Sequence, residues 1–249
     1  MKKRYQGMSS ACLIDNQCVY LKNQGTQQLK LLDNPKSLSY QTMNLESAQV
    51  AGNYLNEVQL IKSYVLLTEQ KIDARSKKCR QESLFNLDSQ SHLAYFQPNV
   101  IADEKTDYAN AITFDLDSFA GLIYMNGLVS TKLKICPKFK LQTRIFVNNN
   151  LILNDIIGTN GHDCEDLGLF TNFTNYNSLF VISDKVDDEY LHHLNAVLGQ
   201  LMVEGCYDIT KLAVPGFVIR LLTNDSASIA VVVKRVLNTV KNELFGFEN

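Results

Sequence analysis

A cluster of metal-ligating residue types occupies five consecutive positions, His162, Asp163, Cys164, Glu165 and Asp166. An imidazole, a thiolate and carboxylates together suit a borderline divalent metal ion. The first three of these residues are therefore the candidate metal ligands. Because adjacent side chains do not easily converge on one ion, an ordinary polar loop is the alternative interpretation.

Two further pairs of residues have side chains that could act in catalysis or metal binding. Asp115 and Asp117 stand two positions apart in an alternating segment, which predicts paired carboxylates on one face of a strand. Such a pair could act in acid–base catalysis, and a solvated strand face is the alternative. His192 and His193 are adjacent in a predicted helix, about 100° apart around its axis, and lie off its leucine face. A solvated histidine pair is the interpretation we favour there.

Common catalytic and nucleotide-binding motifs are missing from the sequence. It contains no G-x-x-x-x-G-K-[ST] loop and no G-x-G-x-x-G segment, so a P-loop or dinucleotide site is not indicated. It also contains no G-x-S-x-G or H-E-x-x-H segment. The sequence therefore does not indicate an enzyme.

Composition restricts the partners and the compartment. The 249 residues carry a net charge of −2, so a basic surface for nucleic acid is not expected. The longest apolar run, at about residues 229–233, is far shorter than the roughly 20 residues that span a bilayer, so no membrane partner is expected. We expect a cytoplasmic protein whose six cysteines are reduced.

The chain up to about residue 182 predicts short β-strands. Ile112, Phe114 and Leu116, for example, alternate with polar residues, and this period of two is typical of strands with one buried face. Turn signals occur at residues 148–150 and 158–161. A sandwich, a barrel and a β-solenoid all fit such a pattern.

Helices are expected only near the C-terminal end. Apolar residues recur with helical spacing over about residues 187–204 and 226–244, and a strand is expected between them at about 216–222. No linker rich in Pro, Gly or Ser interrupts the chain. We therefore predict a single domain over residues 1–249, mostly β with two α-helices in its C-terminal region.

Several segments resemble the urease accessory D/H family. They are residues 64–70 (YVLLTEQ), 93–101 (LAYFQPNVI), 150–155 (NLILND) and 216–222 (GFVIRLL), the last followed by a long helical segment. They occur in the order and at the intervals of that family, from about residue 51 to the end. The chain is identified as a divergent member by this order rather than by any single motif.

The resemblance implies particular site residues. The family-matched positions that could line a polar interior path are Asn53, Thr68, Gln70 and Asp155. Asn53 stands where the family has aspartate. Arg220 matches the arginine of the strand at 216–222, which implies an interface anchor or a buried structural arginine.

The resemblance also implies a fold and a function. Family members are β-solenoid-like or layered β-sheet scaffolds that bind the F-type accessory protein, through which the GTP-hydrolysing G-type protein joins. The assembly docks on the urease apoenzyme and assists nickel insertion. Nickel would bind only transiently, no cofactor would be held tightly, and the protein would not be an enzyme.

Two alternatives stay open beside this hypothesis. One is an all-β enzyme that uses Asp115 and Asp117, or the cluster at residues 162–166. The other is an all-β cytoplasmic binding module unrelated to nickel.

Overall fold

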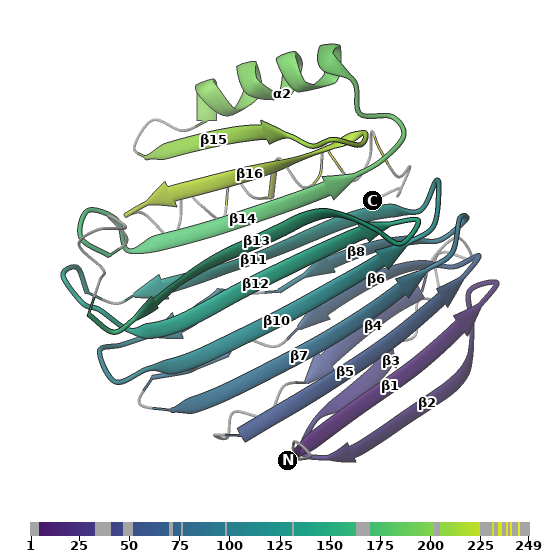
Figure 1. Cartoon of the computed structure of the whole chain (residues 1–249), viewed down its shortest axis with the longest axis horizontal. Helices are drawn as coiled ribbons and strands as arrows, with labels where there is room; N and C mark the ends of the chain where they lie inside the picture. The colour runs from purple at the N-terminus through teal and green to yellow at the C-terminus, as the bar shows by residue number, and fades with distance from the viewer. Residues whose placement is uncertain are drawn as a thin grey trace.

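The structure, a computed structural model, describes residues 5–32, 41–46, 52–69, 72–75, 77–97, 99–130, 132–162, 170–201 and 205–224, and isolated residues beyond them. Two β-sheets and a helical layer make up these parts of the chain (Figure 1). The predicted fold class, mostly β with a solenoid-like or layered arrangement, is confirmed. The single-domain organisation stays a prediction.

Seven strands form the first sheet, which we call sheet A. Its central strands run parallel, and antiparallel strands close both ends. In spatial order these strands are β13 (Asn150–Asn160), β12 (Lys138–Val147), β10 (Asp107–Leu116), β7 (Lys78–Leu87), β5 (Gly52–Ile61), β1 (Gly7–Ile14) and β2 (Gln17–Gly25).

Nine strands form the second sheet, sheet B. Its order is β15 (Cys206–Lys211), β16 (Gly216–Thr223), β14 (Asn175–Ile182), β11 (Gly121–Ser130), β8 (His92–Phe96), β6 (Tyr64–Glu69), β4 (Gln41–Glu46) and β3 (Gln28–Leu32), with β9 (Val100–Ala102) beside β11. The sequence did not predict β15, a short strand whose residues are mostly exposed.

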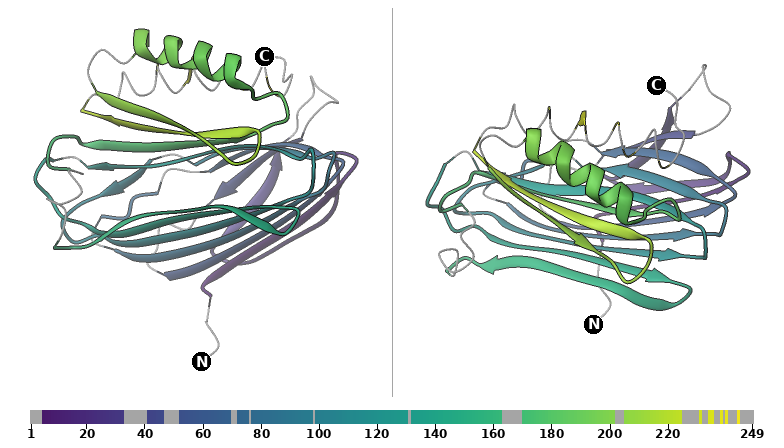
Figure 2. Two further views of the ribbon diagram at one scale, coloured as in Figure 1. Left: turned by 45° about the horizontal axis from the view of Figure 1, so that its top comes forward. Right: turned by 90° about the horizontal axis from the view of Figure 1, so that it is seen from above.

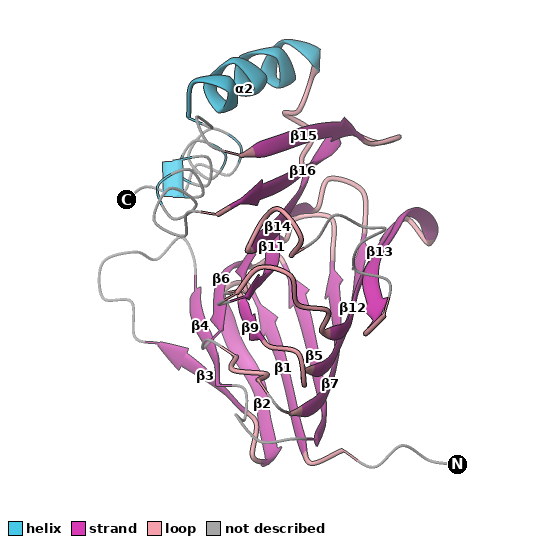
Figure 3. Ribbon diagram, turned by 90° about the vertical axis from the view of Figure 1, so that its left-hand side faces the viewer, coloured by secondary structure: helices cyan, strands magenta, loops and turns pink. Residues whose placement is uncertain are grey.

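The chain winds between the two sheets in successive coils. From β4 to β12 it alternates between them, apart from the short extra strand β9, so strands that follow each other in the sequence lie in opposite sheets (Figure 3). Residues paired on neighbouring parallel strands are about one coil apart: Cys79 pairs with Gly52, 27 positions earlier, and Lys138 with Asp107, 31 positions earlier. This winding is what makes the fold solenoid-like.

Two tight hairpins close the ends of sheet A. Asp15 and Asn16 have φ values of 48° and 61°, and Asn148 and Asn149 have φ values of 50° and 63°. Two central residues with positive φ are typical of two-residue hairpin turns. Apart from glycine, Asn and Asp are the residues that adopt this conformation most readily. The turn predicted at residues 148–150 is therefore confirmed, whereas the one predicted at 158–161 is wrong because β13 continues to Asn160.

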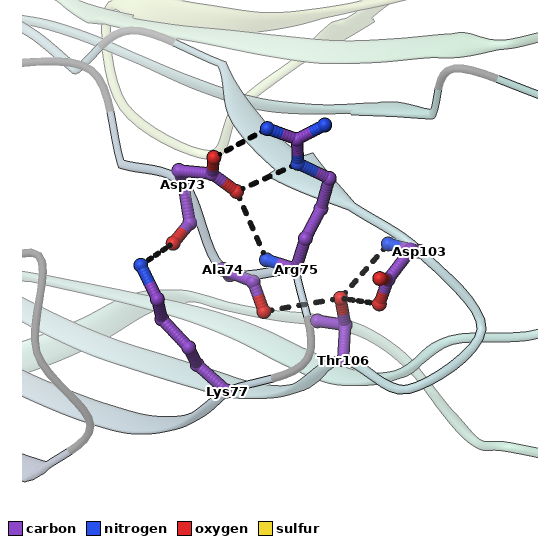
Figure 4. A network of polar contacts seen from close by, with 6 residues as sticks. All are labelled: Asp73, Ala74, Arg75, Lys77, Asp103 and Thr106. Carbon is purple, nitrogen blue, oxygen red and sulfur yellow. Dashed lines mark hydrogen bonds and ion pairs between the residues drawn. The ribbon is translucent and has the colours of Figure 1, made fainter.

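A polar network fixes the connection before β7 (Figure 4). The Arg75 guanidinium binds the Asp73 carboxylate, with nitrogen–oxygen distances of 2.6 and 2.9 Å. The Thr106 hydroxyl donates to the Ala74 carbonyl, 3.2 Å away, and so joins this connection to the turn before β10. Stacked coils are thus held together at their turns as well as along their strands.

The helix α2 (Asp188–Leu201) packs over the β15–β16 end of sheet B (Figure 2). The Asp187 carboxylate caps it by accepting a hydrogen bond of 2.8 Å from the Tyr190 amide. Leu194 and Leu198 are buried against strand residues such as Phe217. The apolar outer face of sheet B is therefore covered at this end.

Only part of the second predicted helix lies within the described residues. Those described are helical, namely Val231, Lys234, Arg235, Asn238, Val240 and Leu244. Val240 and Leu244 are buried in the same apolar cluster as α2. Within the described residues, no helix has the length and apolar character needed to cross a membrane.

The cysteines differ from expectation at one position. Cys12, Cys18, Cys79 and Cys206 are free thiols. Cys136, however, is disulfide-bonded, so the prediction that all six are reduced is wrong there. Cys164 lies outside the described residues.

Candidate functional site

The inward-facing residues change character along each strand. On β10, Tyr108 is buried in one apolar cluster, whereas Ile112 and Phe114 are buried in another. Asn110, between them, also faces inward and is only 3% exposed. A polar residue thus separates two apolar clusters on the same strand face.

The same arrangement recurs on most strands of both sheets, and we call the inward polar residues at this level the polar layer. Its members in sheet A are Ser9, Asn56, Gln81, Ser83, Asn110, Thr143 and Asp155, and those in or directly after strands of sheet B are Glu69, Gln97, Asn126, Ser178 and Arg220. All are buried except Asp155 and Arg220, which are half-buried at one side of the sheets. The layer therefore crosses the interior and reaches the surface region near β13 and β16.

Strand register aligns the polar layer. In sheet B, Asn126 pairs with Ser178, and Ser178 pairs with Arg220. In sheet A, Ser9 pairs with Asn56, which in turn pairs with Ser83 on the next strand. Because paired residues point to the same side of a sheet, such rows place their side chains next to each other in the interior.

Polar side chains also meet across the interior, from one sheet to the other. Three contacts of this kind are Gln81 to Glu69 at 3.0 Å, Asn110 to Gln97 at 2.9 Å and Arg220 to Asp155 at 2.5 Å. They are spread from β6 and β7 to the β13 edge, so the layer is not confined to a single pocket.

Glu69 is the buried carboxyl group of the layer, with 7% of its surface exposed. It accepts hydrogen bonds from the Tyr95 hydroxyl at 2.6 Å and the Gln81 amide at 3.0 Å. Burial raises the pKa of Tyr95 and of Tyr108 well above the ordinary value, and the charge of Glu69 raises both further. These phenols therefore stay protonated.

Asp155 and Arg220 form the outer end of the layer. Burial lowers the pKa of the Arg220 guanidinium, but attraction to Asp155 and interaction with Tyr176 outweigh it, so the net shift is upward. The Tyr176 hydroxyl lies 2.6 Å from the Ser178 hydroxyl. Arg220 is thus a charged group that ties sheet B to sheet A.

Several buried atoms of the layer have no hydrogen-bond partner among the described residues. They are Ser9 Oγ, Asn56 Oδ1, Gln97 Nε2, Asn110 Oδ1 and Asn126 Oδ1. Leaving such an atom unsatisfied costs about 1–3 kcal/mol. Buried groups of this kind ordinarily bind water or an ion, so the layer has spare capacity to hold polar guests.

The family-matched positions divide between the interior and the outside. Asp155 faces the interior and pairs with Arg220, so the structure brings together two residues that the sequence singled out separately. Asn53 and Thr68 alternate with inward residues and lie on the outward faces of β5 and β6. An interior path would therefore not include them, and Gln70 lies outside the described residues.

The candidate metal cluster is only partly described. His162 is exposed, and its amide donates to Asn160 Oδ1 at 2.9 Å. Asp163 and Cys164 lie outside the described residues. Across the described parts of the chain, no group of three His, Cys, Asp or Glu side chains is placed to hold a metal ion.

The predicted carboxylate pair is not formed. Asp115 lies on the outward face of β10, which ends at Leu116, and Asp117 belongs to the following turn. The two residues therefore do not share a strand face. His192 and His193 are both exposed on α2, as a solvated pair would be.

Most of the polar layer was not predicted from the sequence. Glu69 received no role, although it stands two positions after the buried residue Leu67 in an alternating strand. Asn110 likewise stands two positions before Ile112. A polar residue in the inward phase of an apolar alternation was the available signal.

These features define a class of protein. The described parts of the chain form a two-sheet scaffold with a polar layer in its interior. The chain is 27% identical over 173 residues to the urease accessory protein UreD of Streptococcus salivarius and 26% identical over 174 residues to that of Streptococcus thermophilus. It is 21% identical over 178 residues to the urease accessory protein UreD of Staphylococcus aureus.

Each of these matches covers 67% of this chain and 62% of the relative, so the chain spans about three fifths of the length of the curated relatives it matches. No protein-family model matches the chain. The resemblance seen in the sequence is supported, because the chain is similar to urease accessory proteins UreD over about two thirds of its length.

Proposed function

We propose that this protein is a non-catalytic urease accessory scaffold that assists nickel insertion into the urease active site. The observation that carries the proposal is the polar layer, found in a chain that is similar to UreD proteins. A scaffold whose only task was to hold partners together would gain stability from an apolar interior. A polar layer that costs stability fits a protein that passes a polar guest through its interior.

The chemistry of the layer suits a hydrated divalent cation in transit. Carboxyl and amide oxygens, such as those of Glu69, Asn110 and Asn126, can replace part of a hydration shell and lower the cost of burying charge. Divalent nickel is the cargo in this proposal, bound weakly enough to leave. The neutral amides outnumber the carboxylates in the layer, which favours passage over tight retention.

The partners in this proposal are the F-type accessory protein, the G-type protein joined through it, and the urease apoenzyme. Large complementary surfaces serve such an assembly better than a concave active site does.

A cytoplasmic location is part of the proposal, and the disulfide at Cys136 weighs against it, since such bonds are rare in that compartment. Thiol trapping of Cys136 in intact cells tests the location.

Complementation tests the function. Urease and its other accessory proteins are expressed with nickel, first without a D/H member and then with this chain in its place. We expect urease activity to rise above the level without the D/H member. Activity that stays at that level, with the chain folded and present, would overturn the proposal.

A matched pair of variants links the function to the layer. Glu69→Gln changes a buried carboxyl group, and Glu57→Gln changes an exposed one on the outer face of β5. We expect only the first to lower urease activation. Equal activation by both variants would show that the charge of Glu69 is not needed.

A further inference from the structure

The strand β13 forms an open edge of sheet A (Figure 3). It has 11 residues, and within the described parts of the chain it pairs with β12 alone. Leu151 and Ile156 on this strand are 53% and 51% exposed. A long edge with exposed apolar side chains and unpaired backbone groups is a template for adding another strand.

A basic pocket of about 530 Å³ lies beside this edge. It crosses four neighbouring strands, β7, β10, β12 and β13. Its charged lining residues are Arg80, Lys138 and Lys140, opposed by Asp107 alone. The pocket thus has two excess positive charges, whereas the whole chain has a net charge of −2.

The strand register explains the hollow. Arg80, Ala109, Lys140 and Gly158 are paired in one row across the four strands. The small residues Ala109 and Gly158 leave space beside the two long cationic side chains. A Cβ atom on Gly158 would lie 2.5 Å from the Phe139 carbonyl oxygen, so this part of the row must stay small.

The positive charges are only partly neutralised within the protein. Arg80 donates to the Asp107 carbonyl at 2.8 Å and also binds its carboxylate. Lys138 is 3.9 Å from that carboxylate and 57% exposed. Lys140 forms no ion pair within the described parts of the chain, so two lysines are available to an incoming anion.

We propose that the β13 edge and this basic pocket bind an extended acidic segment of a partner protein by strand addition. An added strand would lie about 10 Å from β12, which is two strand spacings of about 4.8 Å. Because Gly158 has no side chain, a glutamate on the added strand can reach over β13 toward Lys140. Backbone pairing would give affinity, and the lysines would select acidic side chains.

Binding of defined peptides tests this proposal independently of any role with urease. The probes are two short fluorescent peptides, one alternating valine with glutamate and the other alternating valine with lysine. We expect saturable binding of the glutamate peptide to the full chain. Its affinity should be at least about tenfold higher than that of the lysine peptide. Equal affinities, or no binding of the glutamate peptide, would overturn the proposal.

Charge-reversal variants locate the site. Lys138→Glu combined with Lys140→Glu should weaken binding of the glutamate peptide by about tenfold or more. The control variant combines Lys22→Glu with Lys185→Glu, which makes the same change in net charge at exposed positions on β2 and in the turn before α2. It should alter the affinity for the glutamate peptide by less than about twofold. Circular dichroism first establishes that both variants are folded.

Two results would contradict the assignment of the site and of its occupant. Equal weakening by the two double variants would show attraction to overall charge rather than to the pocket. Dimerisation in sedimentation velocity that Ile156→Asp abolishes, without peptide binding, would show that the edge serves a second copy of the chain.

Discussion

Two inward positions on β10 differ sharply in the contacts they make. Ile112 is 0% exposed within an apolar cluster that also contains Phe85 and Phe114. Asn110, two residues earlier, is 3% exposed and bonds through its amide to Gln97, while its Oδ1 has no partner among the described residues. The apolar cluster stabilises the fold, whereas the polar layer uses buried positions that apolar residues could fill more favourably.

The contrast between these two positions separates the part of the interior that the fold requires from the part that it does not. Strand pairing continues unchanged through both regions, so the polar layer is not needed to set the register. Under the proposed function, the layer handles polar guests. Variants of the two regions should therefore separate stability from activity.

The largest loss of stability is expected in the apolar cluster. Phe85 is fully buried, and its ring centroid lies 5.3 Å from that of Tyr95 and 5.2 Å from that of Phe114. Phe85→Ala should lower the free energy of unfolding by about 3–5 kcal/mol, because it removes apolar contacts and leaves a cavity. Urea unfolding measures this, and Phe119→Ala at a 75% exposed position is the control that should change little.

The next largest effect is expected at the outer end of the polar layer. Asp155→Ala leaves the Arg220 guanidinium half-buried without its carboxylate, whose nearest oxygen lies 2.5 Å away. Since about a third of the Arg220 side chain is exposed, water screens the charge and the loss should be only about 1–2 kcal/mol. In a double-mutant cycle, the effects of Asp155→Ala and Arg220→Met should be less than additive, and full additivity would contradict the pairing.

A smaller effect is expected in the middle of the layer. Asn110→Leu removes one unsatisfied oxygen and one hydrogen bond to Gln97, and Gln97 still accepts from the Tyr124 hydroxyl at 3.1 Å. The free energy of unfolding should therefore change by less than about 1 kcal/mol in either direction. A loss as large as that of Phe85→Ala would remove the distinction between the two regions.

His92 provides a half-buried polar group outside the layer, and it should produce a modest dependence of stability on pH. Burial lowers its pKa, and its ring stacks on Tyr64 with centroids 4.6 Å apart. Asp184 raises that pKa and Lys185 lowers it by smaller amounts. The unfolded chain then binds the proton more readily, so stability should fall as pH drops below about 6.5 toward the lowered pKa.

Urea unfolding of His92→Phe between neutral and mildly acidic pH checks this prediction. The variant keeps an aromatic ring over Tyr64 and lacks the titrating group. Its stability should depend less on pH than that of the wild type. The same pH dependence in both proteins would assign the effect to other groups.

The individual strands and helices were predicted from the sequence better than the contacts between them. Apolar alternation identified strands such as β10, and the helical spacing near residues 187–204 corresponds to α2. Pairing between strands about 27–31 residues apart follows from coil winding, which no local pattern encodes. Contacts such as that between Asp155 and Arg220, 65 residues apart, were therefore out of reach.

The candidate site shows how a shift of one residue changes a functional prediction. The resemblance pointed to Thr68, which lies on the outer face of β6, whereas its neighbour Glu69 faces the interior. Successive residues of a strand point to opposite faces, so matching a motif by type without fixing its phase selects the wrong side. The burial of Leu67 fixes the phase and places Glu69, two positions later, on the interior side.

Urease activation by Asn126→Leu, measured with nickel at equal amounts of folded protein, tests whether the polar layer takes part in nickel delivery. The substitution removes a buried amide whose Oδ1 has no partner among the described residues and leaves the apolar clusters intact. We expect near-normal stability and a clear loss of activation relative to the wild type. Undiminished activation by this variant, together with undiminished activation by Glu69→Gln, would contradict a role of the polar layer in nickel delivery.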